Sequence, residues 1–293
     1  MILVVGGSGR LGRIVVDRLV SRGDQVRVLT RSAIRPAHLG PTVDVVTGDA
    51  RLPATLESAM IGVDLVVSAM HGFVGRRGTS PASVDRDGNE NLVDAAKAAG
   101  AHIVILSLVG ASLSHPLPLA RMKYVAEQYA WRSGVETTVV RATAFMELWL
   151  DVLRQTVGRS NRPLVFGRGD NPINFVSVQD VAALVDLTIH DLSTRGSTFE
   201  IGGPANISFN EFASKLRPGN NAVRAPRHVP RAMLALTSVL LQPLNTQAGR
   251  QARSALVMDS ADLTFDATEI HRSYPQLPFT SLDQVLDRDL ASK

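Results

Sequence analysis

The first residues whose types and spacing could support chemistry form a glycine-rich turn near the amino terminus. The apolar run Ile2–Val5 precedes it, and a stretch with helical periodicity from Ile14 follows it. Strand, glycine turn and helix in this order gather backbone N–H groups and the positive end of a helix dipole, which favours a pyrophosphate. We predict a dinucleotide site to which the whole turn contributes: Gly6, Gly7, Ser8, Gly9, Arg10, Leu11 and Gly12.

The residues that follow the next apolar run indicate which dinucleotide binds. A carboxylate at this position would hydrogen-bond the ribose 2′-hydroxyl of NAD and repel a phosphate there. This chain instead has Thr30, Arg31 and Ser32, with Arg35 further on. Because a guanidinium and a hydroxyl suit a 2′-phosphate, Arg31 and Ser32 predict NADP(H) over NAD(H). A solvated surface charge at Arg31 remains the alternative.

Small and polar residues follow the third and fourth strand-like runs. Ligands of a doubly wound sheet bind outside the carboxyl ends of its strands, so these positions are candidate contacts. Asp49 is expected to accept from the adenine amino group while Ala50 supports the ring, unless Asp49 caps the helix from Pro53. Ala69 and Met70 are expected to let the cofactor ribose approach.

Three residues are candidates for proton transfer. His71 and Ser107 follow or end predicted strands, and Lys123 lies in a predicted helix. The alternative for Lys123 is a surface ion pair with Glu127, four residues later. Because the histidines are dispersed and lack a helical ligand spacing, we predict no metal site.

Composition limits the classes of function. The chain has 293 residues, no cysteine and a net charge of +4, which excludes disulfides and thiolate catalysis and fits a cytoplasmic location. Its cations are scattered without a stripe, so no nucleic-acid partner is expected. The apolar segment Ala232–Leu241 is too short to cross a bilayer, which takes about 20 residues. It predicts a packing helix and no membrane partner.

Strand-like and helical segments alternate along the first half of the chain, which is typical of a parallel sheet covered on both faces. We predict an α/β fold in which residues 1–145 form a Rossmann-type, doubly wound parallel sheet that binds the dinucleotide. Residues 146–293 are expected to form a smaller, mixed substrate- or partner-binding portion, with some segments returning to the main sheet. After the first two, the predicted strands are Val43–Thr47, Val63–Ala69, Ile103–Ser107 and Thr137–Arg141.

Together these motifs resemble the atypical short-chain dehydrogenase/reductases, especially their NmrA-like branch. The residues that carry the resemblance are Gly6, Asp49, Ser68, Ala69, Ser107, Lys123, Ala126, Glu127, Arg141 and Phe145, followed by residues 174–182 and 199–204. The likeness therefore extends over nearly the whole chain. It implies that the loop after the sixth strand contacts the nicotinamide, through Thr143 and Phe145, although Ala142 replaces a proline common in relatives.

The resemblance leaves two functions open. Short-chain reductases commonly pair a tyrosine with a lysine four residues later, but Leu119 precedes Lys123 by four. In isoflavone-reductase-like relatives the matching lysine is itself the base, which implies an NADPH-dependent reductase of a small hydrophobic carbonyl or quinone. NmrA-type regulators instead bind NADP(H) without catalysis and signal to a protein partner. An epimerase or dehydratase is the weakest hypothesis, because it relies on the absent tyrosine.

The segment after Phe145 has two interpretations. Residues Met146–Leu150 are expected either to line an apolar pocket for a substrate or to form an amphipathic core helix. The sequence does not indicate the substrate or the oligomeric state.

Overall fold

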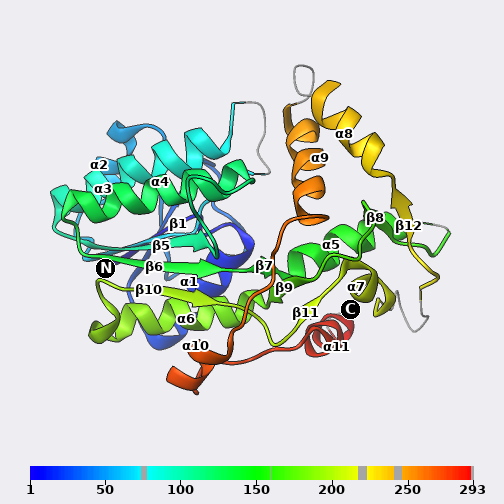
Figure 1. Ribbon diagram of the computed structural model, residues 1–293. Coiled ribbons are helices and arrows are strands. Elements are labelled where there is room, and N and C mark those ends of the chain that lie inside the picture. The colour runs from blue at the N-terminus through cyan, green and yellow to red at the C-terminus, as the bar shows by residue number, and fades with distance from the viewer. Residues whose placement is uncertain (74–77, 159, 217–222, 241–245, 292–293) are drawn as a thin grey trace. The chain divides into compact units, whose positions relative to one another are not determined.

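The chain folds into two units (Figure 1). The first comprises residues 1–142 and 181–200, and the second comprises residues 143–180 and 201–293. The computed structural model describes residues 1–73, 78–158, 160–216, 223–240 and 246–291.

A seven-stranded parallel sheet forms the centre of the first unit, in the order β10-β6-β5-β4-β1-β2-β3. The predicted fold class is confirmed. Most of these strands are runs of buried Val, Ile and Leu, as expected for a parallel sheet covered on both faces. The strands are β1 (Ile2–Val5), β2 (Val26–Thr30), β3 (Asp44–Thr47), β4 (Leu65–Ser68), β5 (His102–Leu108), β6 (Thr137–Ala142) and β10 (Thr198–Ile201).

Helices cover both faces of this sheet, with α2, α3 and α4 on one side and α1 and α6 on the other (Figure 1). Left-handed glycines end two of the helices, at Gly100 and Gly134. The helices are α1 (Arg10–Arg22), α2 (Leu56–Ala59), α3 (Asp87–Ala99), α4 (Pro118–Ser133) and α6 (Val178–His190), with 3₁₀ turns at Pro53–Thr55 and Leu192–Thr194.

The segment before α3 does not continue the α-helix toward the amino terminus. Residues Pro81–Arg86 form a π-helical turn, and α3 begins only at Asp87. Ser80 starts the turn with a capping box: its hydroxyl accepts from the Ser83 N–H, and the Ser83 side chain accepts from the Ser80 N–H. π-Turns are rare and frequently occur at functional sites.

Strand register brings the candidate residues to one edge of the sheet. Val5, the last residue of β1, pairs with Leu29 of β2 and Ser68 of β4, and Ser68 pairs with Ile105 of β5. The residues that follow β1, β2 and β4 therefore emerge together, where a doubly wound sheet binds its ligand.

The second unit is built from short strands, six helices and the first turn of α6 among the described residues. Its core includes Phe175, Phe209 and Phe212, which meet edge to face. Its strands are β7 (Ala144–Phe145), β8 (Leu164–Phe166), β9 (Ile173–Val176), β11 (Asn206–Ile207) and β12 (Arg227–Val229). Its helices are α5 (Met146–Val157), the first turn of α6, α7 (Phe209–Ser214), α8 (Arg231–Leu240), α9 (Thr246–Met258), α10 (Thr268–Ser273) and α11 (Leu282–Ala291).

Two helices of this unit differ in how far local sequence accounts for them. The Ser208 hydroxyl accepts from the Glu211 N–H and caps the start of α7. The prediction that α8 is a packing helix is wrong for most of its surface, because Leu234 is its one buried residue while Leu236 and Val239 are exposed. Apolar composition alone does not decide which side of a helix is covered. No helix among the described residues is long and apolar enough to cross a membrane.

Candidate functional site

The glycine-rich turn between β1 and α1 forms a backbone cradle. Gly6 has a φ of +90°, and a Cβ there would lie 2.7 Å from the Ala69 carbonyl. A Cβ on Gly12 would lie 2.1 Å from the Gly6 oxygen, so neither position tolerates a side chain. The Gly9 N–H donates to the Gly6 carbonyl at 2.9 Å, and the Arg13 N–H donates to Gly9 at 2.9 Å as α1 begins.

Side chains leave the mouth of this turn open. Ser8, Gly9 and Arg10 are exposed, whereas Gly7 and Leu11 are buried in the packing of α1 against the sheet. The N–H groups of the first helical turn precede the first backbone hydrogen bond of α1, so a ligand at the turn meets the positive end of the helix. These features suit an anionic group such as a pyrophosphate.

The predicted 2′-phosphate residues follow β2. Arg31 and Ser32 are both exposed, and the Ser32 hydroxyl accepts from the Ile34 N–H at 3.1 Å. Among the described residues, the Arg31 guanidinium has no hydrogen-bond partner. Arg35 cannot serve the same purpose, because its guanidinium donates to the Gly40 and Val43 carbonyls and closes the loop.

The Asp49 carboxylate is hydrogen-bonded to Arg51. It receives hydrogen bonds from the Arg51 side chain, the shortest at 2.6 Å, and from the Arg51 N–H. These bonds lower the pKa of Asp49, and the charge of Arg31 lowers it further. The alternative that Asp49 caps the turn at Pro53 is wrong, because the cap position there is Leu52. Ala50 is buried behind Asp49, and its carbonyl accepts from Asn91.

A buried ion pair joins the π-helical turn before α3 to α4. The Lys123 ammonium lies 3.1 Å from an Asp85 carboxylate oxygen, and their side chains are 5% and 0% exposed. The ammonium also donates to the Met70 carbonyl at 2.8 Å. A Cβ on Gly6 would clash with Ala69 and the Met70 nitrogen, so the cradle lies close to this loop. Lys123 therefore contacts the same loop that borders the cofactor cradle.

Asp85 is held by the π-helical turn that contains it. Its second oxygen accepts from the Gly72 N–H at 2.8 Å, so the ion pair fixes the loop on both sides of His71. Asn89 donates to the Asp85 carbonyl at 2.7 Å and accepts from the Ser68 hydroxyl at 2.6 Å. These buried hydrogen bonds connect the turn to the end of β4 and leave Asp85 little freedom.

The surface ion pair considered for Lys123 and Glu127 is absent. Glu127 is buried and accepts from Arg141 at 2.6 Å instead, and Arg141 also pairs with Glu200 at 3.1 Å. Each buried charge on α4 therefore has a partner from another element, which lowers the cost of burying it.

His71 lies between the two residues that contact the ion pair. Its side chain remains exposed at the surface, but the surrounding protein removes water from the imidazole and lowers the pKa of His71. The Asp85 charge opposes this shift, and the Lys123 charge adds to it. His71 is therefore neutral at pH 7 and electrostatically coupled to both members of the pair.

Ser107 lies at the carboxyl end of β5, paired in register with Arg141 of β6. Its side chain is buried, and its hydroxyl has no hydrogen-bond partner among the described residues. A buried hydroxyl without a partner costs free energy, so a ligand group that bonds it would gain affinity. This observation keeps Ser107 as a candidate contact.

The last two predicted cofactor contacts belong to the second unit. The Thr143 hydroxyl donates to Asn174 at 2.9 Å, and Phe145 pairs with Val176 before α5 begins. Asn174 also holds the Gly203 peptide through both its carbonyl oxygen and its amide. The segments near 174 and 203, which helped to carry the family resemblance, thus have a structural role.

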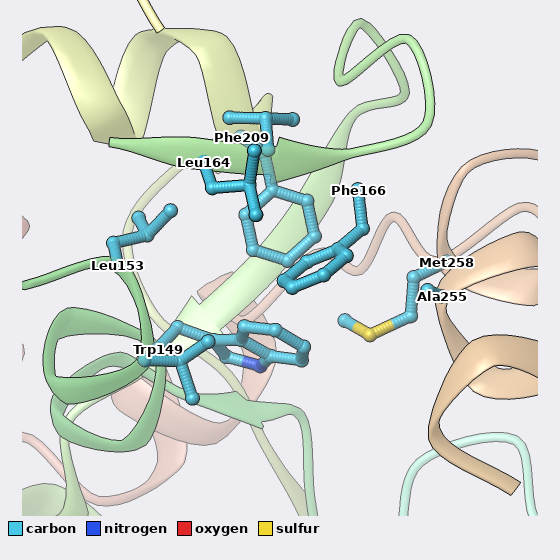
Figure 2. Close-up of a pocket in the computed structure, with 9 residues that line it drawn as sticks. Trp149, Leu153, Leu164, Phe166, Phe209, Ala255 and Met258 are labelled. Carbon is cyan, nitrogen blue, oxygen red and sulfur yellow. The ribbon is translucent and has the colours of Figure 1, made fainter. Parts of the chain in front are cut away.

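An apolar pocket lies within the second unit (Figure 2). Trp149 and Leu153 of α5 point toward Phe209, Phe166 and Met258. The Trp149 and Phe209 rings meet edge to face with centroids 4.7 Å apart. The core-helix interpretation of the segment after Phe145 is confirmed for Met146 and Leu150, which are buried in the core. Trp149 lines the pocket, and a substrate there stays a prediction.

Asp85 is the residue that sequence reasoning missed. Three acids lie close together in the sequence, Asp85, Asp87 and Glu90. The sequence alone does not distinguish which of them meets a buried lysine. Only the π-helical turn selects Asp85 to face Lys123, which lies 38 positions away in the chain.

Comparisons with known proteins agree with this geometry. The NAD(P)H-binding family profile matches residues 6–191. A (4-alkanoyl-5-oxo-2,5-dihydrofuran-3-yl)methyl phosphate reductase of Streptomyces griseus is 32% identical over 219 residues, covering 74% of this chain and 72% of that protein. The photosystem II assembly factor Ycf39 of Synechocystis sp. is 27% identical over 285 residues, covering 93% and 85%.

A solved structure shares the fold over almost its whole length. The NADPH-dependent quinone oxidoreductase QOR2 of Escherichia coli, complexed with NADPH, superposes with a TM-score of 0.77. It is 23% identical and the match covers 98% of this chain and 99% of that one.

Proposed function

Because this chain belongs to the NAD(P)H-binding family and its motifs resemble those of the atypical, NmrA-like short-chain reductases, we propose that it reduces a small hydrophobic carbonyl or quinone with NADPH. The observation that carries the proposal is the buried Lys123–Asp85 pair beside the cofactor cradle. A protein gains little stability by burying an ion pair in place of apolar side chains. A buried pair next to a ligand cradle is therefore a functional candidate.

The preference for NADPH rests on the residues after β2. Arg31 is exposed and without a hydrogen-bond partner among the described residues. Asp49, whose pKa the Arg31 charge lowers, is occupied by Arg51. A 2′-phosphate would therefore meet a guanidinium, and the ribose hydroxyl of NAD would meet no available carboxylate. Arg31 and Ser32 are the proposed phosphate contacts.

The chain's own residues divide the remaining tasks. NADPH supplies a hydride when it is bound. Lys123, fixed by Asp85 and the Met70 carbonyl, would orient the ribose and deliver the proton that completes the reduction. Neutral His71, at the exposed side of the pair, would return a proton from solvent. One hydride and one proton convert a ketone to an alcohol or a quinone to a hydroquinone.

The absence of the usual tyrosine favours the quinone among these substrates. Leu119 lies at the position of the usual tyrosine, so the usual proton donor of the family is missing. A quinone accepts hydride readily and gives a stabilised phenolate-like product, which needs little acid help.

The test is NADPH oxidation by the purified chain with a panel of quinones, enones and ketones. We expect turnover with at least one quinone and a loss of kcat in Lys123→Met, while the NADPH Kd changes less. Binding of NADPH without oxidation across the panel would exclude the reductase. Unchanged kcat in Lys123→Met would remove this residue from the proton path.

A non-catalytic NADP(H)-binding regulator is the second candidate function. Leu119 in place of the tyrosine favours it, and so does the likeness to a photosystem II assembly factor. A regulator would bind NADPH, consume none, and change its affinity for a protein partner when the cofactor binds. The same NADPH titration, followed by partner binding with and without cofactor, separates the two functions.

A further inference from the structure

One helix of the second unit exposes an apolar surface that the proposed reduction does not use. Met233, Leu236, Val239 and Leu240 of α8 are 56%, 59%, 69% and 57% exposed. We call these four residues the α8 apolar face. Met233, Leu236 and Leu240 follow the i, i+3, i+7 spacing of one helix side, and the buried Leu234 points elsewhere.

The sequence around this face is unusually basic. Between Glu211 and Asp259 the chain has seven lysine or arginine residues and no aspartate or glutamate. Because the whole chain carries only +4, the rest of it is net negative. The positive charge is therefore concentrated in the segment that contains α8 and α9.

The structure places several of these cations at the surface. Arg224, Arg227 and Arg253 are exposed, and Arg253 and Arg231 line a shallow groove between α8 and α9. The acid that follows, Asp259, is buried and already paired with Arg168 and Arg231. It therefore adds little negative potential near the α8 apolar face.

We propose that the α8 apolar face and the exposed arginines of the same basic segment bind the surface of an anionic lipid bilayer. Aliphatic side chains on one side of a helix, together with nearby cations, are the features of interfacial binding. Each cation near an anionic membrane strengthens binding by about fivefold. Self-association through this face is disfavoured, because two copies would bring like charges together.

This inference differs from the expectation of no membrane partner, which rested on the length needed to cross a bilayer. A ten-residue helix spans about 15 Å, which suits lying in the interface and not crossing it. The proposal is independent of the reductase activity.

The test is co-flotation of the full chain with vesicles. We expect binding to phosphatidylcholine vesicles that contain one-third phosphatidylglycerol, weaker binding at high salt, and none to pure phosphatidylcholine. The triple change Met233→Gln, Leu236→Gln, Leu240→Gln should lower binding at least about tenfold. Arg253→Glu should lower it about thirtyfold, because it reverses a charge.

Matched controls come from exposed residues of the first unit. Leu192→Gln and Ile61→Gln remove apolar side chains of similar exposure, 68% and 69%, and Arg132→Glu reverses an exposed charge. These should bind as the unaltered chain does, and circular dichroism with thermal melting verifies folding of every variant. Absent binding, equal binding to both vesicle types, or full binding by the α8 variants overturns the proposal. The proposal is also overturned if the α8 variants lose a dimer or a protein complex but keep lipid binding.

Discussion

Charge burial distinguishes a few residues from the many surface cations of this chain. Lys123 and Asp85 meet at 3.1 Å with almost no exposure, and Arg141 meets Glu127 beside them. Arg31, by contrast, is exposed with no hydrogen-bond partner among the described residues. Leaving one of the buried charges unpaired would cost free energy. The exposed Arg31 guanidinium is available to bind an anion.

Arg31→Ala should weaken NADPH binding by about 10- to 100-fold, because a hydrogen bond to a charged group contributes about 1.5–3 kcal/mol. NADH binding should change little. Arg35→Ala is the matched control, since that guanidinium is used within its own loop. Fluorescence titration of both cofactors measures the effect. Equal loss for NADPH and NADH would contradict the assignment of Arg31 to the 2′-phosphate.

Asp85 and Lys123 should behave as a unit in stability measurements. Asp85→Leu or Lys123→Met alone leaves a buried charge without its partner and should cost about 3–5 kcal/mol. The double variant should be more stable than either single variant, because no unpaired charge remains. Denaturant unfolding of the four proteins measures the coupling. Additive losses would show that the two side chains do not interact.

Single elements show how local sequence and tertiary burial combine. β5 is a central strand, and its first residue, His102, is buried in register with Leu65 of β4. Burial lowers the pKa of His102 below its ordinary value of 6.5, although the Glu136 carboxylate opposes the shift. The fold therefore holds His102 in its neutral form.

This lowered pKa makes the fold sensitive to acid. The unfolded chain binds the proton more readily, so stability is present above pH 6.5 and falls as the pH drops toward the lower, folded pKa. The melting temperature should decline below pH 6.5, and His102→Gln should reduce that slope. His228→Gln, at an exposed position, is the control. A slope unchanged in His102→Gln would indicate that other groups cause the acid sensitivity.

The whole molecule combines a cofactor-binding unit with a second unit that has its own core. The cradle, Arg31 and the Lys123–Asp85 pair all belong to the first unit. The aromatic pocket and the α8 apolar face belong to the second. Cofactor binding to the cradle and Arg31 is therefore predicted to stabilise the first unit.

NADPH at about a hundred times its Kd should stabilise the folded chain by about 2.7 kcal/mol, because it binds the folded state. At the same concentration, Arg31→Ala should keep only about 1 kcal/mol of this effect if its affinity is about thirtyfold lower. Thermal unfolding with increasing NADPH measures both values. An equal shift in the two proteins would count against a role for Arg31.

Some features depend on neighbouring residues and were determined by the sequence alone. Gly6 and Gly12, the alternation of strands and helices, and the missing acid after β2 are local patterns with direct steric or electrostatic meaning. They predicted the fold class and the family, which are confirmed. They also predicted a 2′-phosphate preference, which stays a prediction.

Other features depend on contacts between distant residues and were decided only by the tertiary structure. Lys123 donates to the Met70 carbonyl, which is 53 positions away in the chain. Asp85 faces Lys123 because of a π-helical turn, which no spacing rule predicts. Arg35 is occupied by its own loop, and α8 leaves most of its apolar side chains exposed. Periodicity tells which residues share a side of an element, but only packing decides what each side meets.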